Sequence, residues 1–131
     1  MPIIFTVHPD DGYYTAKYIG VVTDTGMMED FRSFLSSGDW YPGLNELADL
    51  SEADVSAVTM PGIKNLSALI AGILQEHNFS PRVAVYAPRD LPYGLARVYS
   101  VHAETFETHC VFRDITEARE WLDYTDDDYE A

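Results

Sequence analysis

The sequence is poor in cysteine and in basic residues. Cys110 is the only cysteine among 131 residues, so an internal disulfide and a cysteine-rich zinc site are both excluded. Eight lysines and arginines stand against 22 aspartates and glutamates, which gives a formal net charge of −14. A surface with this excess of negative charge repels phosphate groups, so we expect neither nucleic acids nor anionic membranes as partners.

Long apolar runs are also absent. No stretch reaches the roughly 20 apolar residues of a membrane-spanning helix, and the first residues lack the basic segment and apolar core of a secretion signal. These absences predict a cytoplasmic protein, and nothing in the sequence calls for a metal or another cofactor. With 47% hydrophobic residues, the chain is long enough for one well-filled core, so we expect one domain.

The apolar periodicity predicts strands that alternate with helices. Strands are expected at residues 3–8, 13–22, 44–50, 82–88 and 109–114. Helices are expected after cap residues 23–25, from about residue 59, over 90–106 and after Asp114. The first two strands are expected to pair as an antiparallel hairpin, because turn-forming residues 9–12 separate them.

This alternation of strands and helices favours a mostly parallel sheet. The predicted fold is therefore α/β, with a mixed five-stranded sheet, an initial antiparallel hairpin and about four helices in one domain over residues 1–122. The segment DYTDDDYEA (123–131) is dominated by aspartate and glutamate. It is predicted to be a disordered acidic C-terminal tail.

Three segments resemble one known family. DLSEADVS (49–56) follows the third predicted strand, PYGLARVY (92–99) lies on the third predicted helix, and VFRDITEAREWL (111–122) closes the domain. Together with the order of elements, they make residues 2–122 similar to the SpoIIAA-like, or STAS-type, domains, and in particular to a branch of small single-domain proteins. The resemblance implies a twisted sheet with helices packed against it, and recognition of protein partners rather than catalysis.

The resemblance also implies a candidate switch. In the anti-sigma-factor antagonists of that superfamily, an Asp followed by a Ser marks the turn before the second helix, and a partner kinase phosphorylates the Ser. Asp54 and Ser56 fall on this pattern, although Ser56 lacks the adjacent hydroxyl residue and the glycine of those antagonists. The alternative is structural, because Ser51, Ser56 and Thr59 are all residue types that cap helices.

Other side chains are candidates for contact with a ligand or a partner. Arg97, beside Tyr93 on the third predicted helix, can hold a carboxylate or phosphate through two hydrogen bonds, or pair with an acidic side chain of the protein itself. Several aromatics can line an apolar ligand pocket, together with the first two helices, or else serve in core and edge packing. These aromatics are Tyr13, Tyr14, Tyr18, Trp40 and Tyr41.

No combination of residues is typical of a catalytic site. His109 and Cys110 are neighbours, but adjacent residues of a strand point to opposite faces, so they cannot form a catalytic pair. We therefore predict a non-catalytic regulatory module that interacts with an unidentified protein partner. The alternative is a binding protein for a small apolar molecule or a lipid. The exposed edge of the first hairpin and the aromatic segment DWYPG (39–43) also predict a weak homodimer.

Overall fold

The computed structural model describes residues 2–123. Apart from Asp123, the predicted acidic tail (123–131) lies outside the described residues. In chain order the elements are β1 (Ile3–His8), β2 (Tyr13–Val21), α1 (Asp24–Leu35), β3 (Asn45–Asp54), α2 (Met60–Glu76), β4 (Arg82–Tyr86), α3 (Asp90–Ala103), β5 (Thr108–Phe112) and α4 (Ile115–Asp123).

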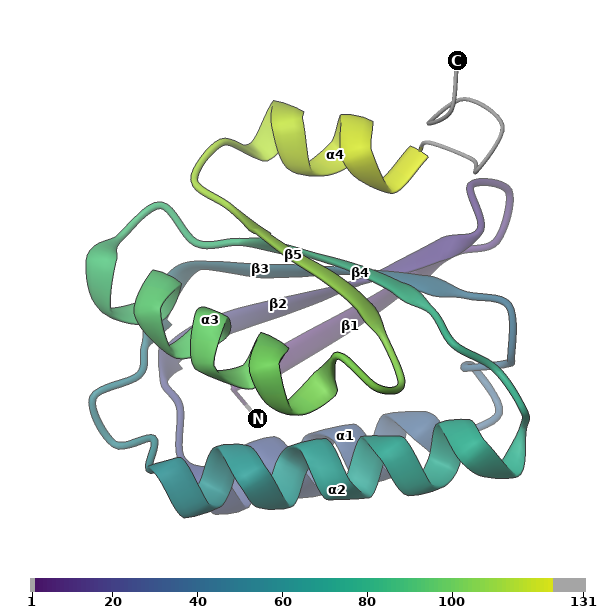
Figure 1. Cartoon of the computed structure of the whole chain (residues 1–131), viewed down its shortest axis with the longest axis horizontal. Coiled ribbons are helices and arrows are strands. Elements are labelled where there is room, and N and C mark those ends of the chain that lie inside the picture. The colour runs from purple at the N-terminus through teal and green to yellow at the C-terminus, as the bar shows by residue number, and fades with distance from the viewer. Residues whose placement is uncertain (1, 124–131) are drawn as a thin grey trace.

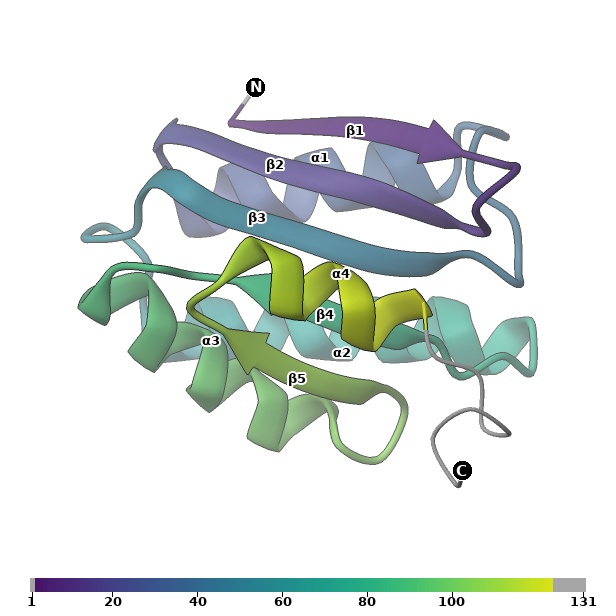
Figure 2. The ribbon, with the colours of Figure 1, turned by 90° about the horizontal axis from the view of Figure 1, so that it is seen from above.

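The strands form one mixed sheet in the order β1-β2-β3-β4-β5, as Figure 2 shows from above. β1 pairs antiparallel with β2, and all the other neighbouring strands are parallel. The predicted five-stranded mixed sheet, its antiparallel hairpin and its four helices are thus confirmed. β1 and β5 are the edge strands.

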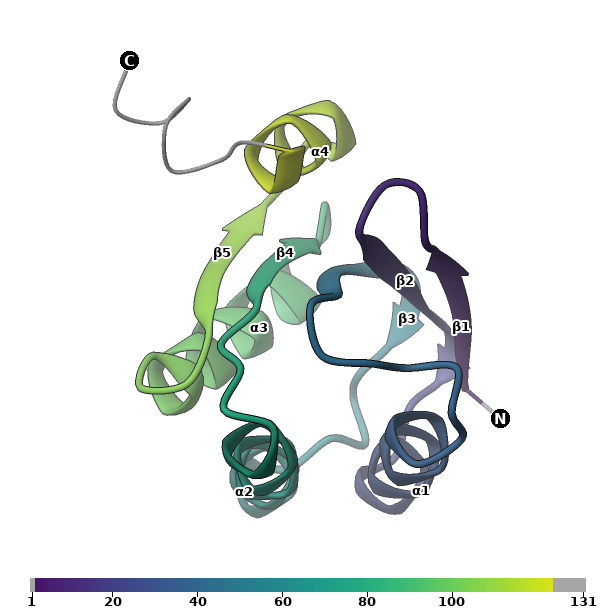
Figure 3. The ribbon, with the colours of Figure 1, turned by 90° about the vertical axis from the view of Figure 1, so that its right-hand side faces the viewer.

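The helices are divided unequally between the two faces of the curved sheet (Figures 1 and 3). α1, α2 and α3 cover one face, and α4 lies across β3, β4 and β5 on the other. The main core lies under the three helices and includes Tyr18, Phe31 and Leu66. A smaller cluster under α4 contains Leu47 and Ala84. No helix within residues 2–123 combines the length and the apolar character that crossing a membrane requires.

The alternation of side chains along β2 explains the two faces of the sheet. Tyr14, Ala16 and Tyr18 are buried toward the three helices, whereas the residues between them are half-buried. The same alternation on β1 buries Ile3 and leaves Ile4 exposed. Residues two apart along a strand therefore share a face, which places the phenol groups of Tyr14 and Tyr18 on the same side as α1.

Several predicted boundaries differ from the structure by one or two residues, and two were wrong by more than that. The third strand was predicted to end at residue 50, but β3 continues to Asp54, because Leu50 and Ala53 are both buried and the strand stays paired with β2. The third helix was predicted to run to residue 106, but it ends at Ala103. The carbonyl of this fully buried residue accepts hydrogen bonds from the next turn, which leads into β5.

Candidate functional site

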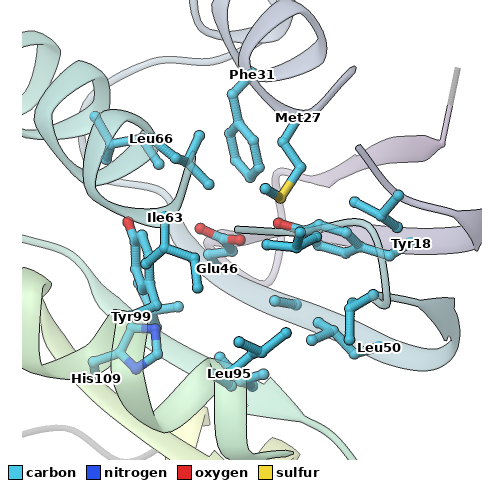
Figure 4. A pocket seen from close by; sticks show the side chains of 18 residues that line it. Tyr18, Met27, Phe31, Glu46, Leu50, Ile63, Leu66, Leu95, Tyr99 and His109 are labelled. Atoms are coloured by element: carbon cyan, nitrogen blue, oxygen red, sulfur yellow. The ribbon is translucent and has the colours of Figure 1, made fainter. Parts of the chain in front are cut away.

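A cavity lies between the sheet and the three helices α1, α2 and α3 (Figure 4). Its volume is about 80 Å³. One buried water molecule needs about 10–15 Å³, so the cavity has room for roughly five to eight. Apolar side chains from all three helices make most of the wall, among them Met27, Phe31, Ile63, Leu66, Ile70 and Leu95.

The carboxyl group of Glu46 interrupts this apolar wall. Glu46 lies on β3 in the same alternation as Ala48, which also lines the cavity, and its side chain is directed inward. In Figure 4 the carboxyl group lies between the hydroxyl groups of Tyr18 and Tyr99. On the neighbouring strand, Tyr14 stands opposite Glu46 and donates a hydrogen bond of 2.9 Å from its hydroxyl to Oε1.

Burial changes the acid strength of this group. Only 7% of Glu46 is exposed, and loss of hydration raises its pKa to about 7, although the hydrogen bond from Tyr14 lowers it. Burial also raises the pKa of Tyr14 well above its ordinary value, and the charge of Glu46 adds to this effect. Near neutral pH the carboxyl group of Glu46 therefore exists in both protonation states.

Two further titratable side chains lie close to the cavity. Glu107 precedes β5 and hydrogen-bonds to Tyr99. Burial, followed by the charge of Glu46, raises the pKa of Glu107 well above its usual range. His109 lies on the cavity wall, and burial lowers its pKa to about 4, so its imidazole is neutral at physiological pH. Within the described residues, Glu107 Oε1 and His109 Nδ1 have no hydrogen-bond partner.

This arrangement can hold a small molecule. Among the described residues that line the cavity, the polar side chains are those of Glu46, Tyr18, Tyr99 and His109. Within residues 2–123, no group of three or more His, Cys, Asp and Glu side chains is placed to hold a metal ion. A molecule with an apolar body and a polar end can bury its body against the helices and direct its polar end to Glu46.

The predicted switch residues lie beside the cavity rather than in it. Asp54 Oδ1 accepts hydrogen bonds from the backbone N–H of Ser56 at 3.0 Å and from its hydroxyl at 2.6 Å, and these bonds lower the pKa of Asp54. Both residues are exposed, but Val55 and Val58 of the same loop line the cavity. The N-cap of α2 is Thr59, so Ser56 lies outside the first turn of that helix.

Arg97 and Tyr93 form a pair on the surface of α3. Arg97 Nη1 lies 3.4 Å from the Tyr93 hydroxyl, and the guanidinium carbon is 5.9 Å from the ring centroid. Arg113 stacks on the same ring at 4.2 Å and forms an ion pair of 2.8 Å with Asp90. Within the described residues Arg97 has no acidic partner, and neither Arg97 nor Tyr93 lines the cavity.

The remaining candidate aromatics are divided between core and surface. Trp40 is buried and packs edge-on against His77, with the ring centroids 5.2 Å apart. Tyr41 is exposed beside a groove along β1. Tyr18 lies on the cavity wall, and Tyr14 reaches that wall through its hydrogen bond to Glu46.

Glu46, Tyr99 and Glu107 were not among the candidates taken from the sequence, and His109 was considered there only as a catalytic partner of Cys110 and rejected. A signal for Glu46 was present, because it shares the alternation of Leu44 and Ala48 in a strand predicted to be buried. An acidic residue at a core-facing position is unusual and often functional. No comparable signal marks Tyr99 or Glu107, because distant segments of the chain bring them to the cavity.

A comparison with solved structures agrees with this architecture. An uncharacterized protein of the DUF3478 family from Shewanella loihica PV-4, described as having a SpoIIAA-like fold, matches with a TM-score of 0.57. The two chains are 22% identical, and the match covers 92% of this chain and 91% of that one. The likeness shows that this chain has a SpoIIAA-like fold. No protein-family model and no curated protein matches the chain.

Proposed function

We propose that this domain of SpoIIAA-like fold is a non-catalytic module that binds a small apolar molecule in the cavity under α1, α2 and α3. The observation that carries the proposal is the cavity of about 80 Å³ with the carboxyl group of Glu46 at its centre. Protein interiors are normally filled, and an incompletely hydrogen-bonded buried carboxyl group lowers stability. A bound molecule offsets both costs.

The size of the cavity limits the class of ligand. Space for roughly five to eight water molecules corresponds to a molecule of at most about five to eight non-hydrogen atoms, with one atom in place of each water molecule. This volume is too small for an intact lipid with two acyl chains. Among the apolar ligands that the sequence suggested, the proposal therefore favours a small molecule over a lipid.

Filling the cavity tests the proposal. Ala96 of α3 is buried and lines the cavity, so the larger side chain of Ala96→Leu occupies the space of a ligand. We expect Ala96→Leu to weaken the binding of hexan-1-ol, measured by calorimetry, by roughly tenfold or more, because about three buried carbon groups are displaced. Native mass spectrometry of freshly purified protein should also show a retained small molecule on wild type and none on this variant.

Ala71→Leu is the matched control. Ala71 lies on α2 outside the cavity wall, so this variant should bind hexan-1-ol as wild type does. Equal affinity of Ala96→Leu and wild type for hexan-1-ol would contradict binding in the cavity. Urea unfolding of both variants shows whether each still folds.

The second candidate function is a regulatory module that recognises a protein partner. The exposed turn of Asp54 and Ser56 favours it, because this turn is accessible and leads into α2. β1 is an edge strand beside Tyr41, and this edge is where a weak homodimer would form. A cytoplasmic location belongs to both candidates and is supported by the lone cysteine.

Substitution of Ser56 tests the second candidate. Phosphorylation would add nearly two negative charges to a turn that already carries Asp54 and Glu52. We expect Ser56→Asp to lose a partner that docks on this turn and Ser56→Ala to retain it, in a pull-down from the native host. Because Ser56 is exposed and is not the cap of α2, we expect Ser56→Ala to lower stability by less than about 1 kcal/mol. The same partners for all three proteins, with no phosphate on residues 51–59, would end the switch hypothesis.

A further inference from the structure

Resting on the proposed function, we infer that the ligand of the cavity carries a cationic amine at its polar end. The carboxyl group of Glu46 binds this amine. An apolar carboxylate of the same size is rejected. The inference names the chemical class of the ligand, which the proposed function leaves open. It depends on the hydrogen bonds that Glu46 does not make and on the charges around the cavity.

The carboxyl group of Glu46 has unused capacity to accept hydrogen bonds. It accepts one hydrogen bond, from Tyr14 to Oε1, within the described residues, whereas an ionised carboxylate has about four acceptor positions. Only 7% of Glu46 is exposed, and its carboxyl group is directed into the cavity. An ammonium group is compact and brings three N–H donors, so it can supply the missing donors and the opposite charge at once.

The charges around the cavity exclude an anionic end. Tyrosine hydroxyls flank the carboxyl group of Glu46 from β2 and α3, and His109 of β5, which is neutral, lines another part of the cavity beside Tyr99. Of the other acidic groups, Glu107 interacts electrostatically with Glu46, and Asp30 interacts with the neighbouring Tyr18. The cavity-lining side chains of α2 and β4 are apolar, and no lysine or arginine within residues 2–123 lines the wall. A carboxylate placed here would find no positive partner among the described lining residues, and the ionised form of Glu46 would repel it.

Binding of an amine should also depend on pH. An ammonium group binds best to the ionised form of Glu46, whose pKa in the free protein is about 7. The ionised fraction rises from about one tenth at pH 6 to about nine tenths at pH 8. An alkylamine stays protonated over this range, since primary amines have pKa values of about 10. The affinity for an amine should therefore increase about tenfold from pH 6 to pH 8, with a proton released on binding at pH 6.

Isothermal titration calorimetry with three ligands of one apolar body tests the inference: hexylamine, hexan-1-ol and hexanoate. At pH 8 we expect wild type to bind hexylamine about tenfold or more tightly than hexan-1-ol, and to show no binding of hexanoate. Titrations at pH 6 in buffers of different ionisation enthalpy count the released protons. The affinity for hexan-1-ol should not follow pH in this way.

Two variants separate the role of Glu46 from a general effect of buried acids. Glu46→Gln keeps the shape of the side chain and can still accept the hydrogen bond from Tyr14, but it has no charge. We expect it to lose the preference for hexylamine and the pH dependence, and to bind hexan-1-ol within about twofold of wild type. Glu107→Gln is the matched control, because Glu107 is also buried but does not line the cavity. It should keep the preference.

The possible outcomes distinguish this inference from the proposed function. If wild type binds hexan-1-ol or hexanoate as tightly as hexylamine at pH 8, and Ala96→Leu weakens that binding, the amine is wrong and the cavity proposal stands. If none of the three ligands binds, both fail. The tenfold change in affinity for hexylamine between pH 6 and pH 8 is measured on wild type alone. A pH-independent affinity therefore overturns the inference even if Glu46→Gln does not fold.

Discussion

Replacing Gly62 by alanine is expected to lower the free energy of unfolding by about 1–2 kcal/mol, after the gain in helix propensity is subtracted. A Cβ atom at this position would lie 2.0 Å from Oδ1, 2.1 Å from Cγ and 2.6 Å from Oδ2 of Asp24. That carboxylate ties the beginning of α1 to the beginning of α2, because it accepts hydrogen bonds from the Thr59 backbone N–H at 2.9 Å and the Thr59 hydroxyl at 2.5 Å. A methyl group on residue 62 displaces the carboxylate, so both hydrogen bonds are lost.

Urea unfolding measures this effect, and the same helix supplies the control. Apart from its chain neighbours and the backbone of its own helix, no atom of the described residues lies within 4 Å of a Cβ built on Gly72. Gly72→Ala is therefore expected to raise stability by about 0.5–1 kcal/mol through its better helix propensity. In an Asp24→Ala background the obstacle is gone, and Gly62→Ala should no longer destabilise the protein. An equal loss of stability in both backgrounds would show that Asp24 is not the obstacle.

Glu46→Gln is expected to become more stable relative to wild type as the pH rises, by about 3 kcal/mol between pH 4.5 and pH 8. The pKa of Glu46 is about 7 in the folded protein, against an ordinary value of 4.5. Between these two values the folded protein holds a proton that the unfolded chain releases, so wild-type stability falls as the pH rises. Glutamine has no proton to lose, and its contribution stays constant.

His109 changes the pH dependence of stability in the opposite direction to Glu46. Wild-type stability alone therefore cannot isolate the effect of Glu46, and a variant is needed. Burial lowers the pKa of His109 to about 4 from 6.5, so between these values the unfolded chain binds a proton that the folded protein does not. This contribution makes stability rise with pH and opposes that of Glu46. The difference between Glu46→Gln and wild type cancels the contribution of His109 and isolates that of Glu46.

Urea unfolding at pH 4.5, 6, 7 and 8 measures the difference between the two proteins. Tyr14→Phe is a useful companion variant, because it removes the hydrogen bond that lowers the pKa of Glu46. In that variant the loss of stability should extend to higher pH than in wild type. A stability difference between Glu46→Gln and wild type that does not change with pH would contradict the raised pKa.

The order of the elements could be predicted from the sequence because its signals are local. The first strand was predicted at residues 3–8 and is β1 (Ile3–His8). Helix starts depend on hydrogen bonds between residues three apart: Thr23 accepts from the N–H of Gly26, Thr59 from that of Gly62, and Asp114 from that of Glu117. The alternation of strands and helices then favours the parallel sheet.

The end of β3 could not be predicted in the same way. Polar side chains follow Leu50, which locally favours a turn, but the strand continues because β2 supplies partners from Ile19 to Val21. The pairing register shifts between Lys17 and Ile19, so the two strands stay paired beyond the point where simple alternation fails. Pairing with a neighbouring strand therefore decided where β3 ends.

The candidate site shows the same division between local and distant information. The sequence by itself placed Glu46 on a strand, on the same face as Leu44 and Ala48. Whether that face is exposed to solvent depends on the helices that cover it. Its hydrogen-bond partner Tyr14 is 32 residues away, and Tyr99 comes from α3 on the far side of the cavity. Local sequence determines which residues are strand and helix, because capping and alternation act over a few residues. Desolvation and enclosure act between segments far apart in the chain, so only the tertiary structure decided that Glu46 lies in a cavity with a raised pKa.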